Sequence, residues 1–137
     1  MTARILIIED EMLVAMELQA ILEDLGYEVV GIAADAAATW PLLANRPSLA
    51  LVDLNLRDGP TGAEIARRLA REHDVKVLFM TANPRLLGDG IAGFVGVLSK
   101  PCDEAEVSAA LAYALRGSDE EAIPPPALRL FAGRDAR

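Results

Sequence analysis

The sequence predicts an α/β fold, a doubly wound sheet of five parallel strands with helices on both faces. Short apolar runs indicate the strands, and they cover residues 4–8, 28–33, 49–52, 75–80 and 94–98. The third run is apolar without polar alternation, which is typical of a parallel strand covered on both faces. Segments with a helical spacing of apolar residues lie between most of these runs. Strands that alternate with helices favour right-handed crossovers, and five such strands favour the sheet order 2-1-3-4-5.

The composition is that of one globular domain. The 137 residues are 53% hydrophobic with a mean hydropathy of +0.27, which is enough apolar material for a core. The longest apolar runs are too short to span a bilayer, and the chain enters its first strand at residue 4, which leaves no room for a signal peptide. We therefore expect a cytoplasmic protein without a membrane segment.

Charge and two rare residue types exclude several classes of function. The formal net charge of -8 disfavours direct nucleic-acid binding, which depends on cationic contacts with phosphates. The single cysteine, Cys102, excludes internal disulfides and cysteine-based metal clusters. The single histidine, His73, argues against a histidine-rich zinc site and a Ser-His-Asp triad.

In the first half of the chain, recognisable signals bound the helical segments. A first helix is indicated by apolar residues at helical spacing, namely Val14, Leu18, Ile21, Leu22 and Leu25, and Gly26 follows as a stop. Asp35 is a candidate N-cap for a second helix that runs toward Asn45. Because Pro41 lies inside this segment, we expect the helix to start late, bend or be short.

In the second half, two four-residue patterns predict helix starts. After the Gly59-Pro60 turn, Thr61-Gly62-Ala63-Glu64 matches a capping box, and Asp103-Glu104-Ala105-Glu106 opens the last helix in the same way. The segment 83–90 holds one proline and two glycines, so we expect a shortened or irregular fourth helix there. We place the domain over residues 1–117 and expect 118–137 to be a flexible linker-like tail, with no effector domain after it.

Acidic residues follow the first and third predicted strands. Glu9 and Asp10 follow the first and Asp53 follows the third, and these two strands are neighbours in the predicted order. Three carboxylates need a counter-ion to stay ionised together, and oxygen ligands suit a hard cation such as Mg²⁺. Thr81 and Lys100 come from neighbouring strand ends, and with a metal they would neutralise charge around a transferring phosphoryl group. Asp53 is then the candidate nucleophile.

The polar residues after successive strands form a specific combination: an acidic pair, Asp53, Thr81 and Lys100-Pro101. With this combination, the sequence resembles a response-regulator receiver domain of two-component signalling. The resemblance covers residues 4–115. It implies a flavodoxin-like fold and the transfer of a phosphoryl group to Asp53 from a phosphohistidine on a histidine kinase or phosphotransfer protein.

The resemblance also implies a role for each residue of the pocket. The implied Mg²⁺ ligands are Asp10 and Asp53 directly, Asn55 through its backbone carbonyl, and Glu9 through a bound water. The implied partners of the phosphoryl oxygens are Lys100, Thr81 and the Ala82 amide.

Residues 79–83 are similar to the single-domain receivers known by a Phe-Ala-Thr-Gly-Tyr-like motif, of which Phe79 and Thr81 match strictly. Val97 stands three positions before Lys100, where many receivers carry a switching aromatic residue. Cys102 stands where a bulky apolar residue is common in the family, and we expect a buried, inert thiol.

Without an aromatic residue at Val97, another element must read out the state of the pocket. We hypothesise that Thr81 acts with the segment after it, which Pro84 weakens and Leu86 and Leu87 anchor, in a disorder-to-order or repacking switch.

Three functions are compatible with the sequence. The first is a single-domain response regulator that signals by protein–protein interaction or drains phosphate from a shared kinase, and it catalyses only its own phosphotransfer and dephosphorylation. The second is a receiver-like binding module that works without phosphorylation. The third is a Mg²⁺-dependent phosphatase of the dehalogenase type, which needs an acid two positions after its nucleophile, and Asn55 cannot donate a proton in that way.

Overall fold

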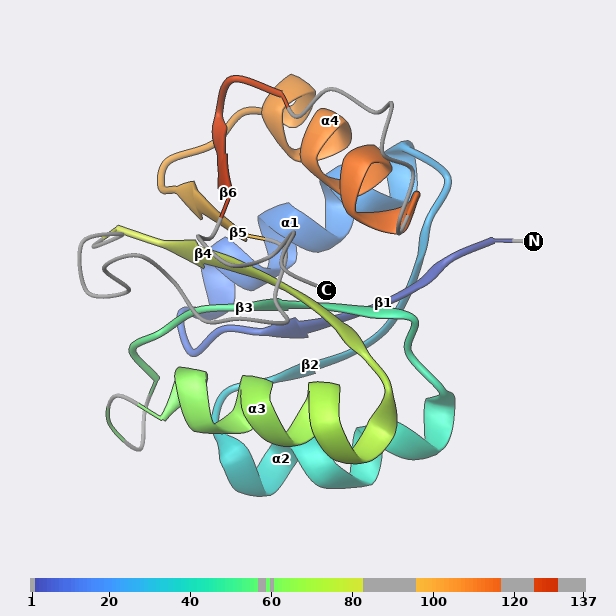
Figure 1. Ribbon diagram of the computed structural model, residues 1–137, viewed down its shortest axis with the longest axis vertical. Helices are drawn as coiled ribbons and strands as arrows, with labels where there is room; N and C mark the ends of the chain where they lie inside the picture. The colour runs from blue at the N-terminus through green and yellow to red at the C-terminus, as the bar shows by residue number, and fades with distance from the viewer. Residues whose placement is uncertain (1, 57–58, 60, 83–95, 117–124, 131–137) are drawn as a thin grey trace.

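The protein is described by a computed structural model that covers residues 2–56, 59, 61–82, 96–116 and 125–130. A six-stranded sheet forms its centre, in the order β2-β1-β3-β4-β5-β6 (Figure 1). The strands are β1 Arg4–Ile8, β2 Glu28–Ala33, β3 Leu49–Val52, β4 Lys76–Thr81, β5 Gly96–Ser99 and β6 Leu128–Leu130. The helices are α1 Met12–Asp24, α2 Ala36–Leu42, α3 Gly62–His73 and α4 Glu104–Leu115, with a short 3-10 helix at Leu43–Asn45.

The five parallel strands pair in the predicted order, so the α/β fold class is confirmed. The predicted strand number is wrong by one, because β6 adds to β5 in the antiparallel direction. Its residues belong to the segment expected to be a flexible tail, and that prediction is wrong for Leu128–Leu130. The sequence carries little local sign of β6, since the strand has three residues and follows a run of prolines.

Helices cover both faces of the sheet, with α1 and α4 on one side and α2 and α3 on the other (Figure 1). Successive strand residues face opposite sides, so Ile5 and Ile7 join the core under α1 and α4 while Leu6 and Ile8 join the core under α2 and α3. All four side chains are fully buried. This double coverage explains why the strands are continuous apolar runs.

The second helix follows its sequence signals. The Asp35 carboxylate accepts a hydrogen bond from the Ala38 amide at 2.9 Å, as an N-cap does. The helix contains Pro41 and gives way after Leu42 to the 3-10 helix, in agreement with the expected short or bent element. The guanidinium of Arg68 on α3 lies 4.1 Å from the centre of the Trp40 ring on α2 and links the two helices.

The two predicted capping boxes have different outcomes. At α4 the box is present, since Asp103 accepts from the Glu106 amide at 2.8 Å and Glu106 accepts from the Asp103 amide at 2.9 Å. At α3 the box is wrong, because Thr61 has φ -92° and ψ -6° and its side chain makes no capping bond. Gly62 packs so closely on the chain after β3 that a Cβ would lie 2.1 Å from the Asp53 carbonyl oxygen, and this contact sets the start of α3.

The predicted irregular fourth helix lies outside the described residues, as do Pro84, Leu86 and Leu87 of the proposed switch. Most of the predicted tail also lies outside them. Among the described helices, none combines the length and the apolar character that crossing a membrane requires.

Candidate functional site

Four neighbouring strands end at one edge of the sheet and place their polar residues there. Glu9 follows β1, Asp53 follows β3, Thr81 ends β4 and Lys100 follows β5. Backbone hydrogen bonds continue the strand pairing past these ends: the Asp53 amide donates to the Ile8 carbonyl at 3.0 Å, and the Lys100 amide donates to the Thr81 carbonyl at 2.9 Å. The convergence of strand ends predicted for this edge is therefore present.

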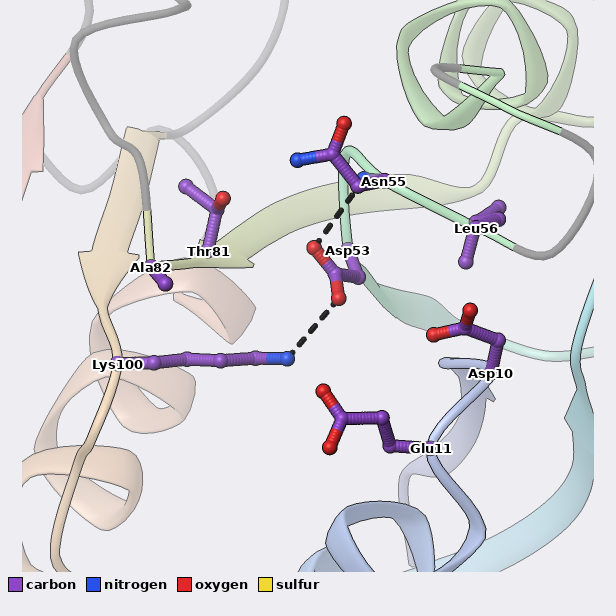
Figure 2. Close-up of a pocket in the computed structure, with 8 residues that line it drawn as sticks. All are labelled: Asp10, Glu11, Asp53, Asn55, Leu56, Thr81, Ala82 and Lys100. Carbon is purple, nitrogen blue, oxygen red and sulfur yellow. Dashed lines mark hydrogen bonds and ion pairs between the residues drawn. The ribbon is translucent and has the colours of Figure 1, made fainter.

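A pocket of about 310 Å³ opens at this edge (Figure 2). Its lining contains six of the predicted residues, namely Asp10, Asp53, Asn55, Thr81, Ala82 and Lys100. Glu11 and Leu56 also line the pocket, and neither was expected there. Glu11 is the third acidic residue of a consecutive run, which is the signal that could have found it.

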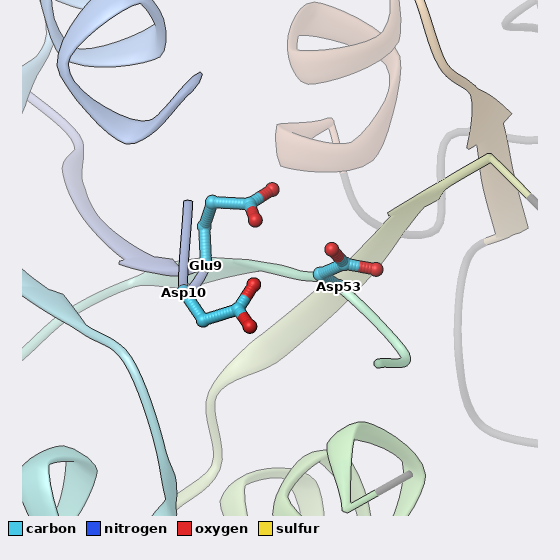
Figure 3. A group of neighbouring side chains, drawn as sticks. All are labelled: Glu9, Asp10 and Asp53. Carbon is cyan, nitrogen blue, oxygen red and sulfur yellow. The ribbon is translucent and has the colours of Figure 1, made fainter. Parts of the chain in front are cut away.

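Three carboxylates come together beside this pocket. One oxygen from each of Glu9, Asp10 and Asp53 lies within 4.8 Å of the others (Figure 3). Glu9 is 2% exposed and Asp53 is 9% exposed, whereas Asp10 is more open to solvent. A cluster of carboxylate oxygens with one exposed member has the donor chemistry that hard divalent cations prefer, since these ions keep several waters.

Lys100 supplies the positive charge of the cluster. Its ammonium group donates to the carboxylate of Glu9 and, at 3.0 Å, to Asp53 Oδ2. Burial alone would lower the pKa of Lys100, but the hydrogen bonds and charges of Glu9 and Asp53 raise it above its ordinary value. The lysine is therefore charged at neutral pH and neutralises part of the acidic cluster.

Glu9 is the most deeply buried acid of the cluster. Burial raises its pKa above the ordinary value, and the hydrogen bonds from Lys100 and from the Glu11 amide oppose that rise. The Glu11 amide lies 3.1 Å from Glu9 Oε2. Glu9 is not among the residues that line the pocket, and the backbone amide of Glu11, at the start of α1, binds its carboxylate.

The Asp53 carboxylate is held at both oxygens. Oδ2 accepts from Lys100, and Oδ1 accepts from the Asn55 amide at 3.3 Å (Figure 2). These contacts orient the carboxylate in the pocket wall beside Thr81 and Ala82. A carboxylate oriented in this way presents an oxygen to an electrophile that enters the pocket.

Two residues near Lys100 differ from the family pattern in size or polarity. Val97 is 1% exposed and belongs to the core that contains Phe79, so a short aliphatic side chain fills this position. The Cys102 thiol is partly buried and donates to the Ser99 carbonyl at 2.9 Å. Burial, followed by the charges of Glu106 and Asp103, raises the pKa of Cys102 to about 11, which keeps the thiol protonated.

Comparison with known proteins assigns the family. The model of the response regulator receiver domain matches residues 5–112. The phyllosphere-induced regulator PhyR of Methylorubrum extorquens is 38% identical over 118 residues, which cover 84% of this chain and 44% of PhyR. The chain thus spans less than half the length of that relative.

Solved structures of similar proteins support the same family. The receiver domain of PhyR from Erythrobacter litoralis has a TM-score of 0.76 and 31% identity, covering 89% of this chain and 96% of that domain. The anti-anti-sigma factor PhyR from Bartonella quintana has a TM-score of 0.75 and 30% identity, covering 85% of this chain and 48% of that protein. This chain belongs to the response regulator receiver domain family, whose members are signalling proteins.

Proposed function

We propose that Asp53 accepts a phosphoryl group from a phosphohistidine on a histidine kinase or phosphotransfer protein. The observation that carries this proposal is the Asp53 carboxylate itself, which lies in a pocket wall, is oriented at both oxygens and contacts a lysine. A carboxylate oxygen attacks phosphorus, the bond from phosphorus to the histidine nitrogen breaks, and the imidazole leaves with its electron pair. The product is an acyl phosphate on Asp53.

The neighbours of Asp53 suit the charge that builds up on the phosphoryl group. Lys100 already contacts Asp53 and can pair with a phosphoryl oxygen, while Thr81 and Ala82 line the same pocket and can donate from the hydroxyl and the amide. These donors are in place before the reaction, so the transfer needs little rearrangement of the strand ends.

We assign Mg²⁺ to the carboxylate cluster. Asp10 and Asp53 are the direct ligands in this proposal, Glu9 acts through water, and Asn55 contributes its carbonyl oxygen. The bound ion would supply positive charge to the phosphoryl oxygens. The mutual distances within the cluster and the exposure of Asp10 support a site open to water and substrate.

For the output, we propose that the phosphorylated protein binds another protein or drains phosphate from a shared kinase. The acidic composition argues against direct DNA contact. One similar protein is described as an anti-anti-sigma factor, which acts on a protein partner, and this favours a protein as the target here as well. A location in the cytoplasm stays a prediction of the sequence.

The test is phosphorylation of the purified chain with Mg²⁺ and acetyl phosphate, followed by intact-protein mass spectrometry. We expect one phosphoryl adduct in the wild type, none in Asp53→Asn, and an unchanged adduct in the control Asp24→Asn, whose exposed carboxylate ends α1. An adduct in Asp53→Asn would contradict the assignment. A wild type without any adduct would favour a binding module that works without phosphorylation.

A further inference from the structure

β6 lies along β5 at the edge of the sheet, and its contacts outline a small docking site for an extended strand. The two strands pair in the antiparallel direction, with Gly96 opposite Leu130, Val97 opposite Arg129 and Leu98 opposite Leu128. Every other strand pair of the sheet is parallel. β6 is therefore an addition to the receiver sheet, like a peptide ligand that extends a sheet at its edge.

The side chains of β6 show which chemistry the edge accepts. Leu128 is 5% exposed and belongs to the core under α1 and α4, and Leu130 packs against that core. Arg129 lies between them with an exposed side chain. The edge thus takes an apolar, a basic and an apolar residue in sequence, with the apolar side chains on the same face.

Gly96 allows the backbone of β6 to lie close to β5. A Cβ at this position would lie 2.3 Å from the Arg129 carbonyl oxygen and 3.1 Å from the Leu130 Cα. The three atoms nearest to that Cβ all belong to the backbone of β6. The absence of a side chain at residue 96 therefore allows the backbone of β6 to lie as close to β5 as it does.

The pairing of β6 with β5 is short enough to be reversible. Three residues form β6, and a turn in which the Leu128 amide donates to the Pro125 carbonyl at 3.1 Å precedes it. Only three residues pair with β5, and of these Leu128 alone is buried, so few contacts hold β6 on the edge. Once β6 leaves, β5 presents unpaired backbone groups and the sequence Gly-Val-Leu-Ser, which lacks the charged or proline residues that usually protect an edge.

We propose that the edge of β5 is a docking surface for an extended peptide with an apolar–basic–apolar pattern, and that β6 occupies it as the chain's own ligand. The net charge of -8 favours a partner with a basic central residue. Along the chain, Leu98 of this edge lies two residues before Lys100, which lines the pocket. The inference stands on the strand contacts and does not rest on phosphorylation of Asp53.

The experiment releases β6 from the edge of β5 in the full chain and adds the same strand as a separate peptide. Leu128→Asp places a carboxylate in an apolar core position and should release β6. The probe is a fluorescein-labelled peptide with the sequence of residues 125–130, Pro-Pro-Ala-Leu-Arg-Leu, measured by anisotropy. We expect at least about tenfold tighter binding to Leu128→Asp than to the wild type, because the tethered strand competes in the wild type.

The matched control is the double variant Leu128→Asp with Gly96→Val, in which the edge is open but a side chain would clash with the backbone of a strand placed as β6 is. Peptide binding to the single variant and not to the double variant would support the proposal. Absence of binding to a folded Leu128→Asp variant, or equal binding to all three proteins, would overturn it. A dimer of Leu128→Asp that no longer binds peptide would also overturn it, since the occupant would then be a second copy.

Amide hydrogen exchange of the wild type provides a readout that does not depend on a variant. We expect the amides of 128–130 to exchange earlier than those of β4, and an excess of unlabelled peptide to accelerate them while 96–98 stay protected. Exchange of 128–130 only through global unfolding, unchanged by peptide, would overturn the proposal.

Discussion

Lys100 is the residue on which the electrostatic balance of the pocket depends. Its side chain is 17% exposed and contacts two carboxylates that are still less exposed. Replacing it by alanine leaves Glu9 and Asp53 without their cation. We expect Lys100→Ala to lose about 2 kcal/mol of unfolding free energy at pH 7.5, somewhat less than for a fully buried pair because the pocket admits water.

Urea denaturation measures this loss, with the exposed Arg67→Ala on α3 as the control. Lowering the pH should restore part of the stability of Lys100→Ala, because the raised pKa of Glu9 lets the folded variant take up a proton on that carboxyl before the unfolded chain does. A variant as stable as the wild type at pH 7.5 would contradict the role of Lys100 as counter-ion.

Asp10 is the exposed member of the carboxylate cluster, and its removal tests the metal site. We expect Mg²⁺ at ten times its dissociation constant to stabilise the wild type by about 1.4 kcal/mol through ligand linkage. Asp10→Ala should lose this effect and should be at least as stable as the wild type without metal, since one like charge is gone. Thermal melts with and without Mg²⁺ measure both, and Glu17→Ala on the exposed side of α1 is the control. A wild-type melting temperature insensitive to Mg²⁺ would count against the metal assignment.

Cys102 carries a prediction about pH. Since folding raises its pKa from 9.0 to about 11, the thiol's contribution to stability is complete below pH 9 and is lost as the pH rises toward 11. At pH 8 the folded chain holds on the order of 100-fold less thiolate than the unfolded chain, so alkylation by iodoacetamide should be slower by about that factor. Rates measured with and without urea test this, and equal rates would show an ordinary thiol.

At the scale of the element, the capping box of α4 stabilises the helix that covers one face of the sheet. Asp103→Ala removes the bond to the Glu106 amide and should cost about 1 kcal/mol in unfolding free energy. Glu104→Ala, one residue further and exposed, is the matched control and should cost clearly less. Urea titrations compare the two variants, and equal losses would indicate that the helix start does not depend on the cap.

The elements also show what a sequence can predict. β1 and β2 have the predicted bounds, because each is a short apolar run that begins at a charged residue, Arg4 or Glu28. The start of α3 could not be predicted from its local pattern, since Gly62 is held by the backbone of Asp53 and Leu54. β6 depends on the opening at Gly96, more than thirty residues away in sequence, so no local signal announces it.

The same distinction applies to the site. The meeting of Glu9, Asp10 and Asp53 follows from the order of parallel strands and could be predicted. The contact of Lys100 with Glu9 could not, because it depends on how a long side chain crosses the pocket. Glu11 could not be predicted as a pocket residue, because its position in the pocket wall depends on where α1 begins.

At the scale of the whole molecule, acidic residues dominate the surface chemistry. The chain holds 21 Asp and Glu against 13 Lys and Arg. A molecule of this charge repels phosphate backbones, so we expect no retention on a double-stranded DNA column even at about 50 mM salt. Column elution measures this, with a basic protein as the positive control, and retention that falls as salt rises would contradict it.

The single tryptophan gives the molecule a spectroscopic consequence. Trp40 belongs to α2 and packs against the core on that side of the sheet, with the guanidinium of Arg68 over its ring, and it is not among the residues that line the pocket. Its emission should therefore follow the melting of the α2 and α3 layer and stay constant when ions or phosphate enter the pocket. Fluorescence titrations of ligands that bind in the pocket therefore need a dye placed near the strand ends. The emission of Trp40 reports instead whether the protein stays folded.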